Sequence, residues 1–435
     1  MWAYRNGLVK PESTIWEKVY PNTSLCRPLA GLLPSNISIY PTVASLDSAN
    51  SHSRLYFVHQ QHNTATVRFS VIKPCRSTMP CRPAVCSHSL GRAWVHELEP
   101  KLDQAARHGL DIELFYEDLE YLANSLSGPS FNDRLREAAK LVRSMCNDRQ
   151  LSIVCLQPFM HYEGLRDRVR HQELIEEMKL WLELVKILDT DIIAIPSTCL
   201  PESEVSGDID LIVQDMREVA DLAAPENVRI AYESLAWGTY ADTWEDAWKV
   251  VSLVDRSNFG ICLDTFNMAA RVYADPSAAS RRNPGADEAM QASLDRLVKT
   301  VDVKKIFFVQ VVDAEYLSDG PLVEGHRFYD ESQAARMSWS RNCRLFYGER
   351  DAYLPIKAIL KAILVDLGFQ GWVSAELFNR SLTGSNPDVP EAHAQRAAVS
   401  WRKIVDDFKL AGSTAQRPAA TSLESYPGLS TRAQL

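Results

Sequence analysis

The chain has 435 residues, of which 46% are hydrophobic and 24% are charged, as is typical of a globular protein with a sizeable core. A formal net charge of −9 argues against a nucleic-acid partner, because phosphate binding depends on clustered Lys and Arg. No apolar run approaches the roughly 18 residues of a membrane span. The nine cysteines are scattered singly, which argues against a disulfide framework and favours a reducing, cytoplasmic setting.

Residues 1–78 differ from the rest of the chain, being rich in Ser, Asn and Pro and lacking sustained periodicity. We interpret them as a low-periodicity extension, disordered or artefactual, with the functional chain beginning at Met79; a mitochondrial transit segment is the alternative. We expect the catalytic domain to cover residues 79–411. Residues 412–435, rich in Ser, Thr, Ala and Pro, are expected to form a disordered tail.

From Arg82 onward, strand-like apolar runs alternate with segments whose apolar residues recur at helical spacing. We expect strands at Ala84–Ser89, Asp111–Tyr116, Leu151–Phe159, Asp191–Pro196, Val228–Leu235, Phe259–Asn267, Lys305–Asp313 and Gly371–Phe378. We expect helices at Leu98–His108, Arg134–Met145, Glu173–Leu188, Asp210–Leu222, Trp244–Val254, Ala289–Val301, Pro355–Leu367 and Glu391–Leu410. Eight such units predict an α/β fold, a closed (β/α)₈ TIM barrel. The alternative is an open doubly wound sheet, which should carry a Gly-rich phosphate loop that Ser87–Arg92 does not supply.

Four of these strands carry one oxygen-bearing side chain near the C-terminal end: Glu233, Asp264, Gln310 and Glu376. An ionised carboxylate in an apolar strand is costly to bury unless a cation or hydrogen bonds compensate. Because active sites of TIM barrels lie at the C-terminal ends of the strands, we expect the four to meet at one mouth. This all-oxygen set suits Mg²⁺ or Mn²⁺ better than zinc, and separate salt bridges are the alternative interpretation.

Further polar residues are expected around the same mouth. His161 and Tyr162 follow the third strand. The long connection 314–354 is interpreted either as a fork for a substrate carboxylate or phosphate or as a solvated basic patch. Its relevant residues are Arg336, Ser340, Arg341 and Arg344. Glu113 and Arg92 could also line the mouth, although a structural role is favoured for both.

From about Ala84 to Leu410 the sequence resembles the fungal 3-dehydroshikimate dehydratases of quinate and shikimate catabolism, within the xylose-isomerase-like family of metal-dependent barrels. The motifs that carry the resemblance include Cys86-Ser-His-Ser-Leu-Gly, Ile112-Glu-Leu-Phe-Tyr-Glu-Asp-Leu, His161-Tyr-Glu-Gly, Tyr232-Glu-Ser-Leu-Ala-Trp-Gly, Leu263-Asp-Thr-Phe-Asn, Gln310-Val-Val-Asp-Ala-Glu and Arg336-Met-Ser-Trp-Ser-Arg-Asn. The resemblance implies a lyase that converts the small molecule 3-dehydroshikimate to protocatechuate. It also implies a divalent metal, Mg²⁺ or Mn²⁺ with Co²⁺ as a further option, on the four oxygen-bearing residues.

The resemblance suggests roles for individual residues. The residues expected to bind substrate are Arg344, Arg341, Ser340, Arg336, Tyr162 and Asn267. His161 is the candidate acid/base, and the ligands Glu233 or Glu376 could double as a base. Sugar isomerases and epimerases of the superfamily commonly carry His where this chain has Gln310 and Asn267, which leaves the proton-transfer residue open.

Three other functions are weighed. A metal-dependent sugar or hydroxypyruvate isomerase or epimerase is the nearest alternative, because it would share the ligands without losing water. An abasic-site endonuclease would need a His-rich multi-metal cluster and a basic groove. A non-catalytic sensor of small acids is the third alternative. The intact set of four metal ligands argues against it.

Overall fold

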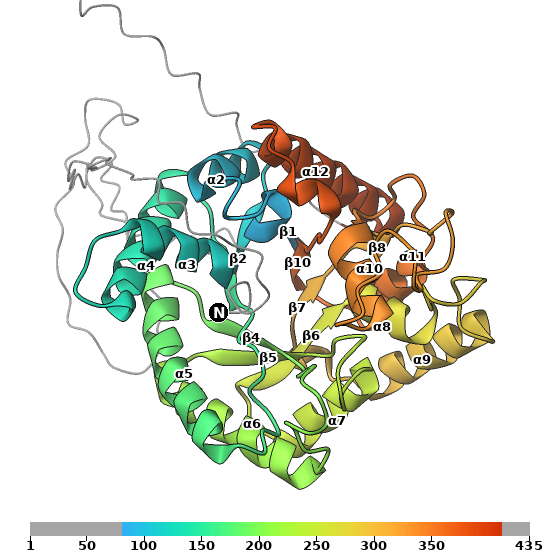
Figure 1. Cartoon of the computed structure of the whole chain (residues 1–435), viewed down its shortest axis with the longest axis horizontal. Coiled ribbons are helices and arrows are strands. Elements are labelled where there is room, and N and C mark those ends of the chain that lie inside the picture. The colour runs from blue at the N-terminus through green and yellow to red at the C-terminus, as the bar shows by residue number, and fades with distance from the viewer. Residues whose placement is uncertain (1–80, 411–435) are drawn as a thin grey trace, which may run out of the picture. The chain divides into compact units, whose positions relative to one another are not determined.

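Eight parallel strands close into a barrel in residues 81–410, the part of the chain that the computed structural model describes (Figure 1). The strands are β1 (Cys81–Cys86), β2 (Asp111–Phe115), β3 (Ile153–Gln157), β4 (Ile192–Pro196), β5 (Arg229–Glu233), β6 (Phe259–Asp264), β7 (Ile306–Gln310) and β10 (Gly371–Ala375). Their order around the barrel is β1-β10-β7-β6-β5-β4-β3-β2. The predicted (β/α)₈ barrel is confirmed, and the open sheet is wrong. The predicted extension 1–78, the start at Met79 and the tail 412–435 lie outside the described residues.

Helices surround the strands, as Figure 1 shows. The α-helices are α2 (Leu98–Arg107), α3 (Tyr116–Ser125), α4 (Phe131–Asp148), α5 (Arg168–Leu188), α6 (Ile209–Ala223), α7 (Trp244–Val254), α8 (Thr265–Val272), α9 (Ala286–Thr300), α10 (Ala335–Cys343), α11 (Ile356–Leu360) and α12 (Val389–Phe408). The last turn of α11 continues as a π-helix, η4 (Lys361–Asp366). Short 3₁₀ segments are η1 (Ser87–Leu90), η2 (Ala224–Glu226), η3 (Val303–Lys305) and η5 (Arg380–Thr383). Within residues 81–410, no helix has both the length and the apolar character that crossing a membrane requires.

Helices α3, α8 and α10 were not predicted, and the positions of the first two explain why. Helices α3 and α8 begin at the residue after β2 and β6, so no polar linker marks the change from strand to helix. The predicted strand Phe259–Asn267 is therefore wrong after Asp264. The Asp264 side chain ends the strand by accepting hydrogen bonds from the main-chain N–H groups of Phe266 and Asn267, which makes it the N-cap of α8.

The first strand lies earlier in the sequence than predicted. It begins at Cys81, where it pairs with Gly371 of β10, and it ends at Cys86. Residues Ser87–Ser89, predicted to be part of this strand, belong to the 3₁₀ turn η1. A short antiparallel pair is formed by β8 (Asp313–Ala314), at the start of the long connection after β7, and β9 (Arg344–Leu345), within that connection. This pair fixes Arg344 next to the barrel.

The strands are apolar on both faces. One large hydrophobic cluster joins strands and helices, and a smaller one is built mainly from strand residues such as Ala84, Cys155, Ala231 and Phe308. This two-sided burial explains the near-continuous apolar runs in the sequence. Polar side chains interrupt it at the C-terminal strand ends, and these side chains form the candidate site.

Candidate active site

Three carboxylates meet at the C-terminal end of the barrel. Glu233 and Asp264 are the last residues of β5 and β6, and Glu376 follows the last residue of β10. All three residues are at most 5% exposed, and one oxygen atom from each lies within 4.8 Å of the others. Parallel strands end on the same side of a barrel, so the sheet itself brings the three together. Three of the four predicted ligands thus form one cluster.

This cluster carries more negative charge than its surroundings balance. Burial raises the pKa of Glu233 and of Glu376 well above the usual value, and repulsion from neighbouring carboxylates raises both further. Arg344 supplies one positive charge, because its Nη1 atom lies 2.8 Å from Oδ2 of Asp264 and 3.1 Å from Oε2 of Glu376. One guanidinium cannot balance three carboxylates. The charge and the oxygen atoms of the cluster therefore fit a divalent cation.

The fourth predicted ligand, Gln310, ends β7 and is held by Glu113 of β2. Its Nε2 atom donates to Oε1 of Glu113 at 2.7 Å, and its Oε1 atom accepts from the Cys262 thiol at 3.3 Å. The hydrogen bonds of Gln310 thus run to these two residues and not to the three carboxylates. Glu113 is fully buried and also accepts from the Ser374 hydroxyl. Burial raises the pKa of Glu113 to about 7.

Gln157, the last residue of β3, connects three other strands. Its Nε2 atom lies 3.1 Å from Oε1 of Glu113, 2.7 Å from Oε1 of Glu376 and 3.6 Å from Sγ of Cys86. We did not select Gln157 from the sequence, although it ends an apolar strand just as Gln310 does. Glu113 gave a weaker signal, because it lies in the middle of its strand.

Asn267 lies in the first turn of α8 and contacts two of the predicted ligands. Its Nδ2 atom donates to Oε1 of Glu233 at 2.8 Å and to Oδ2 of Asp264 at 3.2 Å. Its Oδ1 atom accepts from the main-chain N–H of Ala236 at 3.1 Å. We predicted a substrate contact here, and the structure uses the amide to orient two carboxylates.

Arg344 lies in a different environment from the one predicted. It is 1% exposed, and its Nε atom donates to Oγ of Ser340 at 2.9 Å. The guanidinium carbon lies 4.3 Å from the ring centre of Phe266 and 5.1 Å from that of Phe378. We expected this fork to face the carboxylate of a substrate. In the structure, the guanidinium instead faces the carboxylates of Asp264 and Glu376.

The other two arginines predicted to bind substrate, Arg336 and Arg341, have different hydrogen-bond partners. Arg336 donates to the main-chain oxygens of Ala270 and Ala274. Its guanidinium therefore binds main-chain groups at the C-terminal end of α8 and does not face the barrel mouth. Arg341 is partly exposed and donates to Oε1 of Gln333. Burial lowers the pKa of Arg341 to about 10. Of the two, Arg341 keeps the character of an anion-binding residue.

His161 and Tyr162 follow β3 but face different surroundings. His161 is partly buried, and its Nδ1 atom lies 3.3 Å from Oγ1 of Thr198. Tyr162 is completely buried, with its ring centre 4.9 Å from that of His171 on α5. The Tyr162 ring thus packs beside the surrounding helices, and the predicted substrate contact does not match this position.

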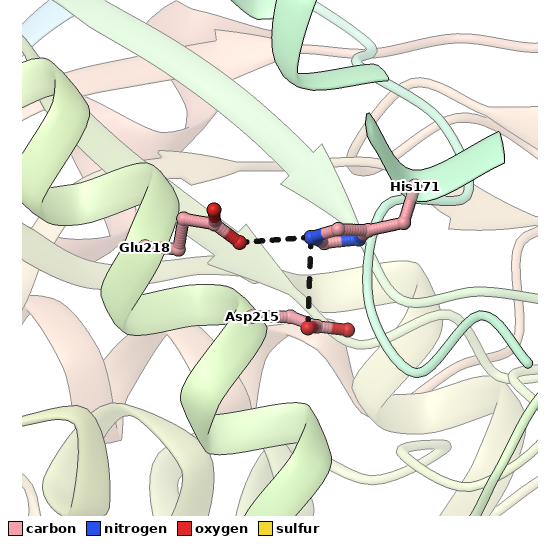
Figure 2. Close-up of side chains that lie close together, drawn as sticks. All are labelled: His171, Asp215 and Glu218. Carbon is pink, nitrogen blue, oxygen red and sulfur yellow. Dashed lines mark hydrogen bonds and ion pairs between the residues drawn. The ribbon is translucent and has the colours of Figure 1, made fainter. Parts of the chain in front are cut away.

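A second cluster of ionisable groups lies between α5 and α6 (Figure 2). The Nε2 atom of His171 lies 2.9 Å from Oε2 of Glu218 and 3.6 Å from Oδ1 of Asp215. Asp215 is already paired with Arg168, at 2.7 Å, and accepts from the main-chain N–H of Gly164. With its charge balanced in this way, the cluster connects helices and has the features of a structural ion-pair network.

The fold and the carboxylate cluster define a class of protein. The family model described as xylose isomerase-like TIM barrel matches residues 102–404, so the chain belongs to that family. A solved xylose isomerase-like TIM barrel/4-hydroxyphenylpyruvate dioxygenase fusion protein superposes with a TM-score of 0.55 at 27% identity, covering 74% of this chain and 42% of that one. The IOLI protein, solved with a bound zinc atom, has the same fold, with a TM-score of 0.55 at 21% identity over 75% of this chain and 99% of that one.

The relatives of this chain by sequence include two 3-dehydroshikimate dehydratases. The chain is 52% identical to 3-dehydroshikimate dehydratase of Neurospora crassa over 344 residues, which are 76% of this chain and 96% of that protein. It is 30% identical to 3-dehydroshikimate dehydratase of Pseudomonas putida over 65% of this chain, but spans only 36% of that longer protein. The resemblance inferred from the motifs is confirmed.

Proposed function

We propose that the protein is a metal-dependent carbon-oxygen lyase that dehydrates 3-dehydroshikimate to protocatechuate (3,4-dihydroxybenzoate). The observation that carries this proposal is the 52% identity to the Neurospora crassa dehydratase across nearly the whole of that protein. The buried carboxylate cluster at the barrel mouth agrees with it.

We also propose a cytoplasmic setting, which the free thiols of all cysteines in residues 81–410 support.

Glu233, Asp264 and Glu376 would hold the metal ion, with Gln310 as the fourth ligand. Support comes from the surplus of buried negative charge and from the oxygen-only donor set, which favours Mg²⁺ or Mn²⁺, with Co²⁺ as a further option. A bound divalent ion would polarise the substrate ketone and make the neighbouring C–H bond more acidic.

The protein's own residues would orient the ring and move protons. In the reaction, a proton leaves the carbon beside the ketone, the β-hydroxyl leaves as water and the ring becomes aromatic. Arg341 is proposed to bind the ring carboxylate, since guanidinium groups bind planar anions through two hydrogen bonds. His161 is proposed as the acid/base, and Glu233 or Glu376 as a second base. The burial of the cluster would exclude bulk water.

The decisive experiment follows the formation of an aromatic product. Purified full-length protein is incubated with 3-dehydroshikimate and Mg²⁺ or Mn²⁺, and the ultraviolet absorbance of protocatechuate is recorded over time. Glu376→Gln serves as the control, because it removes one carboxylate at nearly constant shape. A sugar or hydroxypyruvate isomerase would give no aromatic product. Absence of product from the wild-type protein with either metal would refute the proposal.

A further inference from the structure

His88 lies one level above the polar layer of the barrel interior. The amide of Gln157 reaches Cys86, Glu113 and Glu376 together, so these three residues of β1, β2 and the end of β10 share one level. Phe115 lies two positions after Glu113 in β2 and therefore on the same face of that strand. The ring of Phe115 contacts the rings of His88, in the turn η1, and Phe378, which follows β10. These three rings form the next layer toward the mouth.

The three rings of this layer contact one another. The imidazole ring of His88 lies 4.7 Å from the ring of Phe115 and 4.4 Å from that of Phe378, measured between ring centres. The two phenyl rings lie 5.9 Å apart, edge to face. His88 is 1% exposed, whereas Phe115 and Phe378 are only partly buried. The layer thus has an open side, with His88 as its buried polar member.

Neither ring nitrogen of His88 has a hydrogen-bond partner in the protein. A buried polar atom without a partner costs free energy, and such atoms are rare in folded proteins. Burial, together with the positive charges of Arg92, Lys101 and Arg344, lowers the pKa of His88 well below its ordinary value. The ring is therefore neutral and offers one donor and one acceptor.

Packing alone would be better served by an apolar side chain at this position, because two phenyl rings flank it. We propose that His88 is a substrate-contacting residue, which forms a hydrogen bond with a hydroxyl group on the ring of the substrate. A hydroxyl both donates and accepts, as a neutral imidazole does, whereas a carboxylate is better matched by the neighbouring guanidiniums. This inference rests on the proposed dehydratase activity and adds a contact that the metal ligands do not provide.

The test separates a substrate contact from a packing role by measuring stability and turnover together. In His88→Leu we expect kcat/KM to fall about 10- to 100-fold, the loss typical of one buried hydrogen bond. The melting temperature should stay equal or rise, because the substitution removes two unpartnered polar atoms. His88→Asn and His88→Gln place an amide near the position of Nδ1 or Nε2, and one of them should recover part of kcat/KM.

His171→Leu is the matched control. His171 is also buried, at 3% exposure, but both of its ring nitrogens have partners, namely the main-chain oxygen of Tyr162 at 3.4 Å and Glu218 at 2.9 Å. We expect this variant to melt at a lower temperature and to keep kcat/KM within about threefold of wild type.

Two results of the turnover and melting measurements would overturn the inference. One is a kcat/KM of His88→Leu within about threefold of wild type, and the other is a loss of stability as large as that of His171→Leu. Calorimetric binding of protocatechuate to the wild type and to His88→Leu gives a readout that does not need turnover. If the wild type fails to dehydrate 3-dehydroshikimate, the proposed function fails. Equal affinity of the two proteins for protocatechuate counts against the contact alone.

Discussion

The amide of Gln310 on β7 is tied to the carboxylate of Glu113 on β2, with 2.7 Å between Nε2 and Oε1, although the two strands are not neighbours in the barrel. This bond decides which atom of the amide can serve as a metal ligand. The nitrogen is engaged by Glu113, so the oxygen, whose partner is the weak donor Cys262, is the atom left to bind a cation. Residues that orient ligands in this way commonly change metal affinity about 10- to 100-fold when they are replaced.

Glu113→Gln is therefore expected to weaken metal binding about 10- to 100-fold, because an amide at position 113 no longer demands the nitrogen of Gln310. The measurement is the affinity of metal-stripped protein for Mn²⁺ by calorimetry. Glu163→Gln is the matched control, since Glu163 is also a buried glutamate with a raised pKa but accepts hydrogen bonds from Thr198 and Tyr232, away from Gln310. Equal Mn²⁺ affinity of the two variants would contradict the orienting role.

Removing the metal should abolish turnover and leave the fold intact. The core of the barrel consists of two clusters of packed apolar side chains, so the fold does not depend on a cation. We expect protein treated with chelator to keep its circular dichroism spectrum and a cooperative melting transition, while product formation stops and returns with added Mg²⁺ or Mn²⁺. Full activity in metal-stripped protein would rule out a metal-dependent reaction.

Arg344 should link stability to metal binding. Replacing it as Arg344→Met leaves Asp264 and Glu376 without their cation, and breaking a buried ion pair costs about 3–5 kcal/mol. A divalent ion would neutralise the same carboxylates, so added Mn²⁺ should raise the melting temperature of this variant more than that of wild type. The measurement is thermal melting with and without Mn²⁺. Equal increments in the two proteins would mean that metal and guanidinium do not share these carboxylates.

Glu163 should make stability fall as the pH rises. Burial raises its pKa in the folded protein from 4.5 to about 7, so between these values the folded state binds a proton that the unfolded chain releases. The resulting cost is fully present above about pH 7 and is on the order of 3 kcal/mol. In Glu163→Gln this part of the pH dependence should disappear. Chemical denaturation at pH 5 and pH 8 measures it, and an unchanged difference between the two pH values would contradict the assignment.

The barrel could be predicted from the sequence because each strand is apolar on both faces and each helix has one apolar face. These patterns follow from burial. The sequence was also sufficient for Glu233, Asp264 and Glu376, because a charge at the end of an apolar strand is conspicuous. It did not reveal that Arg344 pairs with two of them, since this contact depends on how a 41-residue connection folds back through β8 and β9.

Tyr162 shows a different limit. A residue that follows a strand end can turn toward the mouth or toward the surrounding helices, and the chain gives no periodic pattern in a loop to decide between them. His161 and Tyr162 are neighbours in the sequence, yet the second packs against His171 on α5. Gln157 could have been predicted, because it is the last residue of its strand, as Glu233, Asp264 and Gln310 are of theirs.

Asp264 has consequences for how the site can be altered by mutation. Its side chain belongs to the carboxylate cluster, caps α8 through two main-chain N–H groups and pairs with Arg344. A library of variants at this position would lose soluble protein and activity together, so selection could not tune one without the other. Gln310 makes neither a cap nor an ion pair, and a laboratory search for altered metal preference should find its accepted substitutions there.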